Sequence, residues 1–293
     1  MHAPRLSGRR ALCALLFIAI EATHASRARA QGLGSERHDV ATFTGDIWSV
    51  WTSPARFDHR DALPLALTAG ALALGTRIDS ATRVWMVTHE RTAVMRMLTP
   101  TREGFPVPAY ELGSGQYLLP LSAALYLAGR LSHSVNLRDA GLGCAAGHLS
   151  SLGIRSIAYS LVSRARPRIT PHPLDVGVPG SHDWFWHSFF SGHIANSMAC
   201  ASFLGHRYSL GIAEPLPYAY AAVIGLGRMA DGEHWASDTM MGAIVGFAIG
   251  REIAARQLER RAAATTASST SASASAAKAR GTRILVPLVA FSF

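Results

Sequence analysis

The feature that most limits the fold is a series of apolar segments of helical length, separated by glycine, proline and charged residues. The alternation of apolar and polar residues that is typical of strands is nearly absent before the last dozen residues. The pattern therefore predicts an all-α fold, a helical bundle of about six core helices. The expected segments run over residues 63–75, 80–98, 117–131, 139–163, 192–205, 217–228 and 233–258.

These apolar runs are short for membrane spans, which need roughly 20 apolar residues. Residues 112–129 carry no charge but contain Gly, Ser and Gln, and the run over 239–250 ends at Arg251. Apolar residues make up 49% of the chain and charged residues 16%, a mild composition for a multi-pass membrane protein. A bundle that is apolar on nearly all sides can still sit partly in lipid, so membrane association stays open.

The first residues of the chain have the composition of an export signal. A basic region with three arginines precedes an apolar run over 11–20, and a small-x-small cleavage site ends at Ala30. We therefore expect a signal peptide over 1–30, with an uncleaved anchor as the alternative. An exported protein of the bacterial periplasm follows, or a membrane protein with its site facing the periplasm.

The rest of the chain divides by composition. Residues 31–61 are an N-terminal amphipathic segment, 62–261 the helical domain, 262–281 an Ala/Ser/Thr-rich flexible linker and 282–293 an apolar C-terminal tail. Within the first of these, four apolar residues fall on one helical face that ends before Pro54. We expect this face to pack on the core, and a helix lying on a membrane surface is the alternative. The four residues are Phe43, Ile47, Trp48 and Trp51.

Charge and cysteine content limit the partners and the compartment. The net charge is +9, and the arginines that carry it are dispersed, without the clustered stripe of a nucleic-acid-binding module. Anionic substrates or lipid head groups suit such a balance. Cys144 and Cys200 each lie in an Ala/Gly-rich helical context, which favours two buried free thiols. An oxidising compartment would allow a bridge between them.

The segment Ser191-Gly192-His193 opens one of the apolar runs. Ser191 is a suitable N-cap, and Gly192 allows a ligand to approach the backbone closely. The first N–H groups of a helix point outward, where the helix dipole favours an anion. His193 would lie beside that anion and donate a proton to a leaving oxygen. An ordinary helix cap with a histidine in its first turn is the alternative.

A second group holds Arg228, His234 and Asp238. His234 and Asp238 are four residues apart and share a face of one helix, so the carboxylate would fix the imidazole tautomer. The other ring nitrogen is then a nucleophile or base. Arg228 precedes a turn that can fold its guanidinium over the same site, where it matches two phosphate oxygens. A surface ion pair is the alternative, and Glu233 is interpreted as an N-terminal helix acid.

Arg166-Pro167 closes the preceding helical segment, because a residue before proline disfavours helical geometry. Arg166 would thereby sit at a helix end, free to reach an anion. Alone, this pair does not indicate an anion site. The neighbouring Arg164 and Arg168 are equally well interpreted as solvated charges.

The order and spacing of the three groups resemble the type 2 phosphatidic acid phosphatase (PAP2) superfamily, which includes bacterial acid phosphatases and vanadium haloperoxidases. The family pattern is Lys-x6-Arg-Pro, then Pro-Ser-Gly-His, then Ser-Arg-x5-His-x3-Asp. The three groups here match the end of the first motif and most of the other two. The resemblance covers residues 110–255 and is strongest over 155–250.

The resemblance implies a metal-independent phosphatase without a cofactor. His234 would attack phosphorus and form a phosphohistidine, Asp238 would orient it, and His193 would protonate the leaving alcohol. The substrate would be a phosphomonoester or diphosphate, either a small molecule or a lipid. The implied phosphate-binding residues are Arg166, Arg228, Ser191 and Gly192.

Three positions depart from the family pattern. Tyr159 stands in place of the lysine, Phe190 in place of the motif proline and Gly227 in place of the serine before Arg228. The lysine matters most, because in the family it contacts the oxyanion. Arg155, one helical turn earlier, and the Tyr159 hydroxyl are the two candidate replacements.

Two other functions compete with the phosphatase. One is a haloperoxidase that holds vanadate in the same pocket. The other is a catalytically impaired envelope protein that binds phosphorylated lipid. Binding alone needs no nucleophile with an orienting carboxylate, so His193, His234 and Asp238 favour the enzyme.

Overall fold

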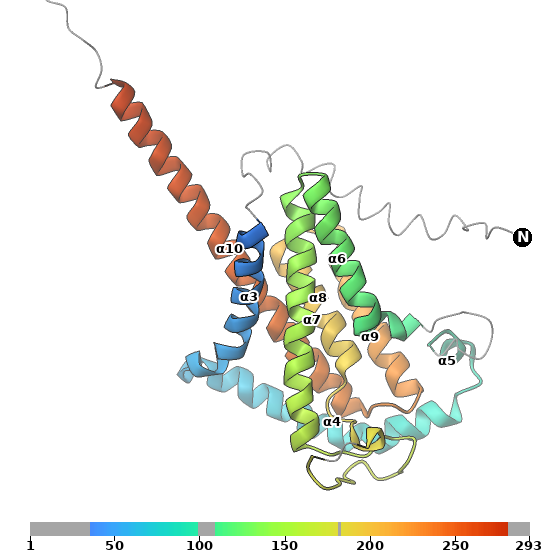
Figure 1. Ribbon diagram of the computed structural model, residues 1–293. Helices are drawn as coiled ribbons and strands as arrows, with labels where there is room; N and C mark the ends of the chain where they lie inside the picture. The colour runs from blue at the N-terminus through green and yellow to red at the C-terminus, as the bar shows by residue number, and fades with distance from the viewer. Residues whose placement is uncertain (1–35, 99–108, 181–182, 281–293) are drawn as a thin grey trace, which may run out of the picture. The chain divides into compact units, whose positions relative to one another are not determined.

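The computed structural model describes residues 36–98, 109–180 and 183–280. The regular elements in these ranges are helices, joined by turns, 3-10 segments and two isolated β-bridges at Arg164, so the predicted all-α fold is confirmed (Figure 1). The predicted signal peptide and C-terminal tail lie outside the described residues. The α-helices are α3 (Glu36–Thr52), α4 (Ala62–Thr88), α5 (Ala93–Leu98), α6 (Gly115–Leu131), α7 (Val135–Leu161), α8 (Gly192–Arg207), α9 (Pro215–Ala230) and α10 (Ala236–Arg280).

The chain divides into two compact units, residues 1–254 and 255–293. In the second unit, α10 continues as a helix to Arg280, where the sequence predicts a flexible linker over 262–281. That prediction is wrong for residues 262–280. Alanine has the highest intrinsic helix propensity, and this segment is rich in it. The residues discussed below belong to the first unit.

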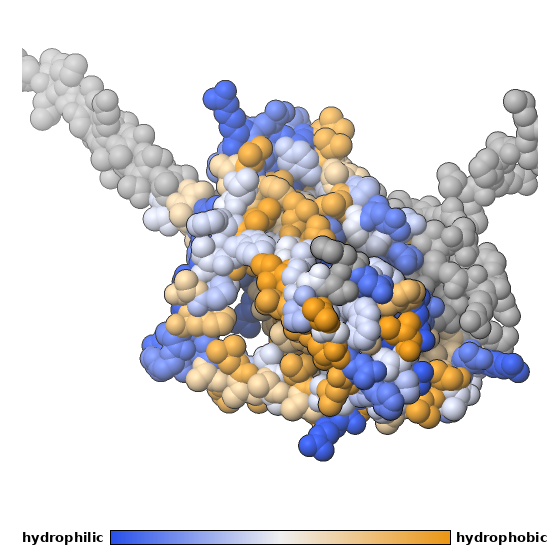
Figure 2. Space-filling model, turned by 60° about the horizontal axis from the view of Figure 1, so that its bottom comes forward, coloured by the Kyte–Doolittle hydropathy of each residue, from blue (hydrophilic) through white to orange (hydrophobic). Residues whose placement is uncertain are grey.

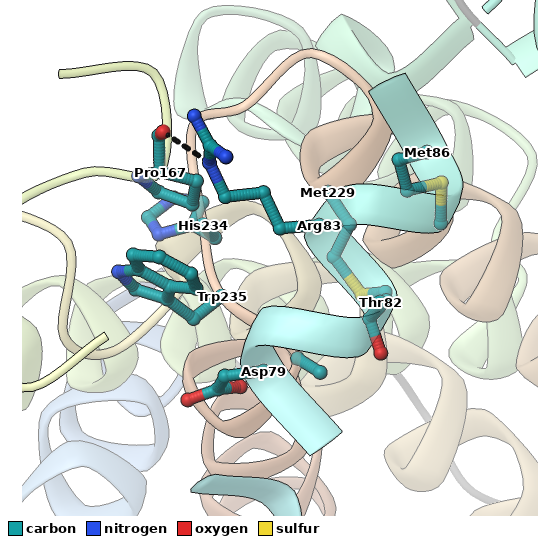
Figure 3. Close-up of a pocket in the computed structure, with 9 residues that line it drawn as sticks. Asp79, Thr82, Arg83, Met86, Pro167, Met229, His234 and Trp235 are labelled. Atoms are coloured by element: carbon teal, nitrogen blue, oxygen red, sulfur yellow. Dashed lines mark hydrogen bonds between the residues drawn. The ribbon is translucent and has the colours of Figure 1, made fainter. Parts of the chain in front are cut away.

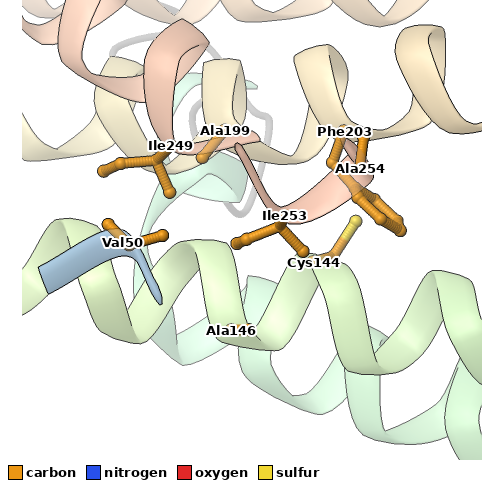
Figure 4. Packing of buried hydrophobic residues seen from close by; sticks show 8 residues of the cluster. All are labelled: Val50, Cys144, Ala146, Ala199, Phe203, Ile249, Ile253 and Ala254. Atoms are coloured by element: carbon orange, nitrogen blue, oxygen red, sulfur yellow. The ribbon is translucent and has the colours of Figure 1, made fainter. Parts of the chain in front are cut away.

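The core of the first unit lies where α7, α8 and α10 meet α3. Consecutive helices pack on each other from α6 to α9, and α3 packs on α7. Apolar side chains from four helices form the central cluster (Figure 4). Its members are Val50, Cys144, Ala146, Ala199, Phe203, Ile249, Ile253 and Ala254.

Cys144 of α7 and Cys200 of α8 form a disulfide, so the expectation of two free thiols is wrong. The Ala/Gly-rich context that suggested inert buried thiols is what allows the two helices to approach. Their Cα atoms at this point are 4.6 Å apart, within the range that a disulfide spans.

The helix α4 is continuous, whereas the sequence predicts one segment over 63–75 and a second over 80–98, with the charged residues Arg77 and Asp79 in the break between them. Asp79 does not end the helix, because its carboxylate is buried and paired. Its oxygens accept from Arg164 at 2.6 Å and from the Ser237 backbone N–H at 2.8 Å. A charge that finds buried partners can lie in the middle of a helix, and this one ties α4 to the start of α10.

Three glycines of α10 let it approach α8 closely. Gly242, Gly246 and Gly250 recur every fourth residue, so they share one helical face. A Cβ atom on Gly246 would lie 2.3 Å from the carbonyl oxygen of Ala195, and the other two glycines meet the α8 backbone as closely. The close packing of α8 on α10 brings together the N-terminal ends of both helices.

The face predicted for the N-terminal amphipathic segment packs only in part. Phe43 and Ile47 contact the central cluster, and the Trp51 ring lies against Gly153 of α7. Trp48 is 71% exposed and does not belong to that face. Among the described helices, none combines the length and the apolar character that crossing a membrane requires.

Candidate active site

His234 lies two residues before α10, and a hydrogen bond from one of its ring nitrogens to the main chain holds the imidazole in place. Its Nδ1 is 2.7 Å from the carbonyl oxygen of Ser188. A carbonyl oxygen can only accept, so Nδ1 carries the proton and Nε2 carries the lone pair. Burial, reinforced by Arg228 and Arg166, lowers the pKa of His234 well below its usual value. The imidazole is therefore neutral at neutral pH, with its nucleophilic nitrogen defined by a main-chain contact.

Asp238 does not contact the His234 ring, so the prediction that it orients the imidazole directly is wrong. Asp238 is in the first turn of α10, and its carboxylate accepts from the Ser188 hydroxyl at 2.5 Å and from the Trp235 N–H at 3.0 Å. Its other oxygen is 2.5 Å from Arg164. The carboxylate thus holds Ser188, whose carbonyl holds His234, and its influence on the nucleophile passes through that residue.

Arg164 joins this carboxylate to a second one. It is 5% exposed and bonds to both Asp238 and Asp79, so the interpretation of Arg164 as a solvated charge is wrong. A guanidinium has a planar set of donors that can serve two carboxylates at once. The result is a buried network that joins α4, Arg164, Ser188 and the start of α10 next to His234.

Ser191 occupies the N-cap of α8, but its hydroxyl does not cap the helix. The side chain is fully buried, and its Oγ has no hydrogen-bond partner within the described residues. A buried hydroxyl without a partner costs free energy, so this one is a candidate to bond to a ligand at the helix end. The first N–H groups of α8 lack intrahelical acceptors at the same place.

Arg155 reaches the same helix end, as one of the two replacements for the family lysine. A Cβ atom on Gly192 would lie 2.2 Å from a guanidinium nitrogen of Arg155, so only glycine leaves room for that cation. The Arg155 guanidinium also lies 5.5 Å from the centre of the Tyr159 ring. Tyr159 stacks on His187 with ring centres 4.9 Å apart, and burial raises the pKa of its hydroxyl. Of the two candidate replacements, Arg155 is therefore the one that brings a positive charge to this helix end.

Arg166 is fully buried and is not at a helix end, because α7 stops at Leu161. Its three guanidinium nitrogens donate to the Trp184 carbonyl at 3.0 Å, to the His187 carbonyl at 3.0 Å and to Glu233. The expectation of an arginine free to reach an anion is wrong for this residue. Arg166 anchors the 168–187 loop beside the site.

Glu233 is the carboxylate that neutralises the arginines of the site. It pairs with Arg166, lies 2.5 Å from Arg168 and 3.3 Å from Arg228, and is 4% exposed. The interpretation as a helix acid is wrong, since α10 begins only at Ala236. Glu233 reduces the repulsion among these three cations, of which Arg166 and Arg228 are buried and Arg168 is exposed.

His193 lies in the first turn of α8 with Glu111 beside it. Its Nε2 is 3.7 Å from a carboxylate oxygen of Glu111, and the other oxygen of Glu111 is 3.6 Å from Arg228. Burial lowers the pKa of His193, and Arg228 and Arg155 lower it further, whereas Glu111 raises it. The His193 imidazole, more than Arg228, lowers the pKa of the Glu111 carboxyl.

A small pocket lies between His234 and α4 (Figure 3). Asp79, Arg83 and Met86 form its α4 side, and Pro167, with His234, closes the other. The Arg83 Nε donates to the Pro167 carbonyl at 2.8 Å, drawn as the dashed line. This bond attaches α4 to the loop that carries Arg166.

The structure thus gathers most of the predicted residues and adds several that the sequence reading missed. His193, His234, Arg228, Ser191 and Gly192 meet at the ends of α8, α9 and α10. The role of Glu233 at the site could have been predicted, because the sequence places this acid directly before His234 of the third motif. Asp79 and Glu111 lie far from the motifs in sequence, and only the packing of α4 and the 109–113 turn brings them to the site.

Comparison with family models agrees with the resemblance that the three motifs indicate. Residues 141–262 match the family model of the PAP2 superfamily, which confirms the resemblance. No curated protein sequence matches the chain.

Two solved structures match parts of the chain at low sequence identity. A transmembrane PAP2-type phosphatidylglycerolphosphate phosphatase of Bacillus subtilis has 18% sequence identity and a TM-score of 0.48, over 67% of this chain and 96% of that one. LpxE of Aquifex aeolicus has 23% identity and a TM-score of 0.36, over 55% of this chain and 94% of that one.

Proposed function

We propose, for a chain whose residues 141–262 belong to the PAP2 superfamily, that it is a phosphatase acting through a phosphohistidine on His234. The observation that carries this proposal is the contact of His234 Nδ1 with the Ser188 carbonyl. It leaves the lone pair on Nε2, the atom that must attack phosphorus. Substrates are phosphomonoesters or diphosphates, lipid-linked ones included.

The first half-reaction transfers the phosphoryl group to the protein. Nε2 of His234 forms a bond to phosphorus as the bond to the leaving oxygen breaks, and His193 gives that oxygen a proton. Ser191, Arg155 and Arg228 hold the phosphoryl oxygens together with the first N–H groups of α8. Each such contact is worth on the order of 3 kcal/mol in the transition state.

In the second half-reaction, His193 takes a proton from water as the water attacks phosphorus. The bond to His234 breaks, and phosphate is released. Asp238 acts as a positioning residue in both halves, because it holds Ser188 and not the ring itself. We propose that the arginines and the helix N-terminus supply the positive charge for this chemistry without a metal ion, and that EDTA leaves the rate unchanged.

The surface beside the site supports a substrate with an apolar part. The helix α4, which lines the pocket at His234, exposes many apolar side chains. It lies at the bottom of Figure 1, and Figure 2, in which that side comes forward, shows apolar patches there. Trp184 and Phe185, from the loop that Arg166 anchors, are 49% and 44% exposed. We therefore favour a lipid-linked phosphate and membrane association over a free sugar or nucleotide. The exposed residues of α4 include Leu63, Leu65, Leu67, Leu74, Ile78, Val84, Trp85 and Val87.

An exported location is consistent with the disulfide between Cys144 and Cys200. Disulfides persist in oxidising compartments such as the bacterial periplasm and are rare in the cytosol. Together with the expected signal peptide, this supports a site that faces the periplasm.

The test is phosphate release from p-nitrophenyl phosphate and from phosphatidic acid in micelles, by purified protein without residues 1–30. We expect turnover in EDTA, abolished by His234→Ala and retained by His172→Ala, a change at an exposed loop histidine. Faster turnover of the lipid would establish a lipid-linked substrate class.

Two other outcomes would replace the proposal. Vanadate-dependent peroxidase activity without phosphate release would identify a haloperoxidase. Binding of phosphatidic acid without either activity would identify a phospholipid-binding protein.

A further inference from the structure

The turn that carries Glu111 is fixed against α8. The 3-10 segment Ala109–Gly113 packs on α8 and α9. The Gly113 carbonyl accepts from the Asn196 amide at 3.4 Å. A Cβ atom on Gly113 would lie 2.7 Å from the Ser197 hydroxyl and 3.0 Å from the His193 carbonyl oxygen. These contacts hold the turn that carries Glu111 against the first two turns of α8.

His193 is surrounded by groups that disfavour its protonated form. Arg228 and Arg155 oppose its positive charge, and burial removes water from it. His148 and His234 are the other titratable groups that act on it, from α7 and from the segment before α10. Glu111 is the group that favours the cation, at 3.7 Å.

We propose that Glu111 is a positioning residue that keeps the leaving-group proton on His193. This inference rests on the proposed function, in which His193 must begin the first half-reaction protonated. As the phosphorus–oxygen bond breaks, the electron pair goes to the leaving oxygen, and the proton passes from the His193 imidazolium to that oxygen. His193 ends neutral, and Glu111 stays ionised throughout.

The same carboxylate has a second consequence for Arg228. Glu111 lies 3.6 Å from it, and Glu233 lies 3.3 Å from it on another side. Replacing Glu111 leaves Arg228 paired with Glu233, so the position of the phosphate-binding guanidinium is kept. The loss in Glu111→Gln therefore falls on proton donation and not on phosphate binding.

The test compares two substrates in kcat/KM, which reports the steps up to the first bond cleavage. An alkyl phosphate ester leaves as an alkoxide and needs the proton, whereas p-nitrophenyl phosphate leaves as a stable phenolate and does not. For Glu111→Gln we expect a loss of about a hundredfold on the alkyl ester and less than about threefold on p-nitrophenyl phosphate. Glu90→Gln, which removes an exposed carboxylate elsewhere, is the matched control and should leave both unchanged.

The negative charge of Glu111 sets the direction in which the pH–kcat/KM profile should move. Removing the Glu111 anion lowers the pKa of His193, so the alkaline limb of the pH–kcat/KM profile for the alkyl ester should move to lower pH. Equal losses on both substrates, with the alkaline limb unmoved, would overturn the proposal. No loss on either substrate would overturn it as well.

A direct measurement separates this inference from the proposed function. The His193 ring can be titrated by NMR in the full mature chain, in wild type and in Glu111→Gln, without any substrate. We expect a lower pKa of His193 in the variant. If the pKa falls but the wild type releases no phosphate, the proposed function fails while the coupling of Glu111 to His193 stands. An unchanged pKa contradicts the inference whatever the activity.

Discussion

Ser191 offers the sharpest separation between function and stability at the level of single residues. Its hydroxyl is buried and has no acceptor or donor in the described part of the chain, so removing it breaks no hydrogen bond of the folded protein. We predict that Ser191→Ala lowers kcat about a hundredfold, because one oxyanion donor is lost. The melting temperature should stay the same or rise. A large fall in melting temperature would show that the hydroxyl serves the fold.

His148 gives a prediction for the dependence of stability on pH. Burial lowers its pKa to about 4, with Arg155 contributing. Below pH 6.5 the unfolded chain binds a proton at this histidine, and the folded protein does not until about pH 4. The stabilisation is present above pH 6.5 and is lost as pH falls, by about 3 kcal/mol.

Urea unfolding at a series of pH values measures this loss. The variant His148→Gln, which does not titrate, should lose correspondingly less stability between pH 6.5 and 4. His234 contributes in the same direction, so some acid sensitivity remains in the variant. An identical pH dependence in both proteins would contradict the assignment to His148.

At this scale, the sequence predicted which residues lie together better than it predicted their contacts. The types and spacing of His193, His234 and Asp238 were sufficient to place them at one site. The predicted partner of Asp238 was wrong, because its carboxylate bonds to Arg164 and Ser188. A sequence pattern does not show which of several possible partners a buried carboxylate will contact.

Among the helices, the packing of α8 on α10 is the contact on which the site geometry depends most. Gly246→Ala would place a methyl group 2.3 Å from the Ala195 carbonyl and push the two helices apart. We predict a loss of about 1–3 kcal/mol in unfolding free energy, as for other overpacked sites. Activity should fall as well, because His193 and His234 are carried by the ends that this contact aligns.

Gly70→Ala is the matched control for that substitution. Gly70 lies within α4, and a Cβ atom there meets no atom within 4 Å. The change should stabilise the protein by about 0.4–1 kcal/mol, because alanine restricts the unfolded chain. Destabilisation by both variants would contradict the account of the α8–α10 contact, since it would reflect glycine replacement in general.

The helix boundaries could be predicted where local chemistry sets them and not where tertiary contacts do. Ser191 and Gly192 marked the start of α8 correctly. The expected break at Asp79 was wrong, because Arg164 and Ser237, distant in sequence, neutralise that charge inside α4. The sequence contains the glycine repeat of α10, but it does not show that α8 is the helix on which these glycines pack.

For the whole molecule, the disulfide is the strongest constraint on the unfolded chain. Cys144 and Cys200 are 56 residues apart, and a cross-link over such a loop stabilises a protein by about 2–4 kcal/mol. The double variant Cys144→Ala/Cys200→Ala should therefore unfold at lower urea concentration. Dithiothreitol should destabilise the wild type and leave the variant unaffected. Two free thiols in the unreduced, unfolded protein without residues 1–30, which lacks Cys13, would contradict the bond.

The fold class and the resemblance to the PAP2 superfamily could be predicted from the sequence, since helical periodicity and three spaced motifs indicate them. The proposals on compartment and substrate class rest instead on features spread over the molecule: the disulfide between α7 and α8 and the exposed apolar side chains of α4. Neither feature has a short motif, so neither could be predicted before the helices were placed together.

The central claim is that His234 carries the phosphoryl group during turnover. The most direct test is a rapid quench, in alkaline denaturant, of the mature protein with a phosphorus-labelled substrate, followed by peptide mapping. Our account predicts label on the peptide that contains His234, retained in base and lost in acid, and none in His234→Ala. Steady turnover without labelled protein, or label on a different residue, would contradict it.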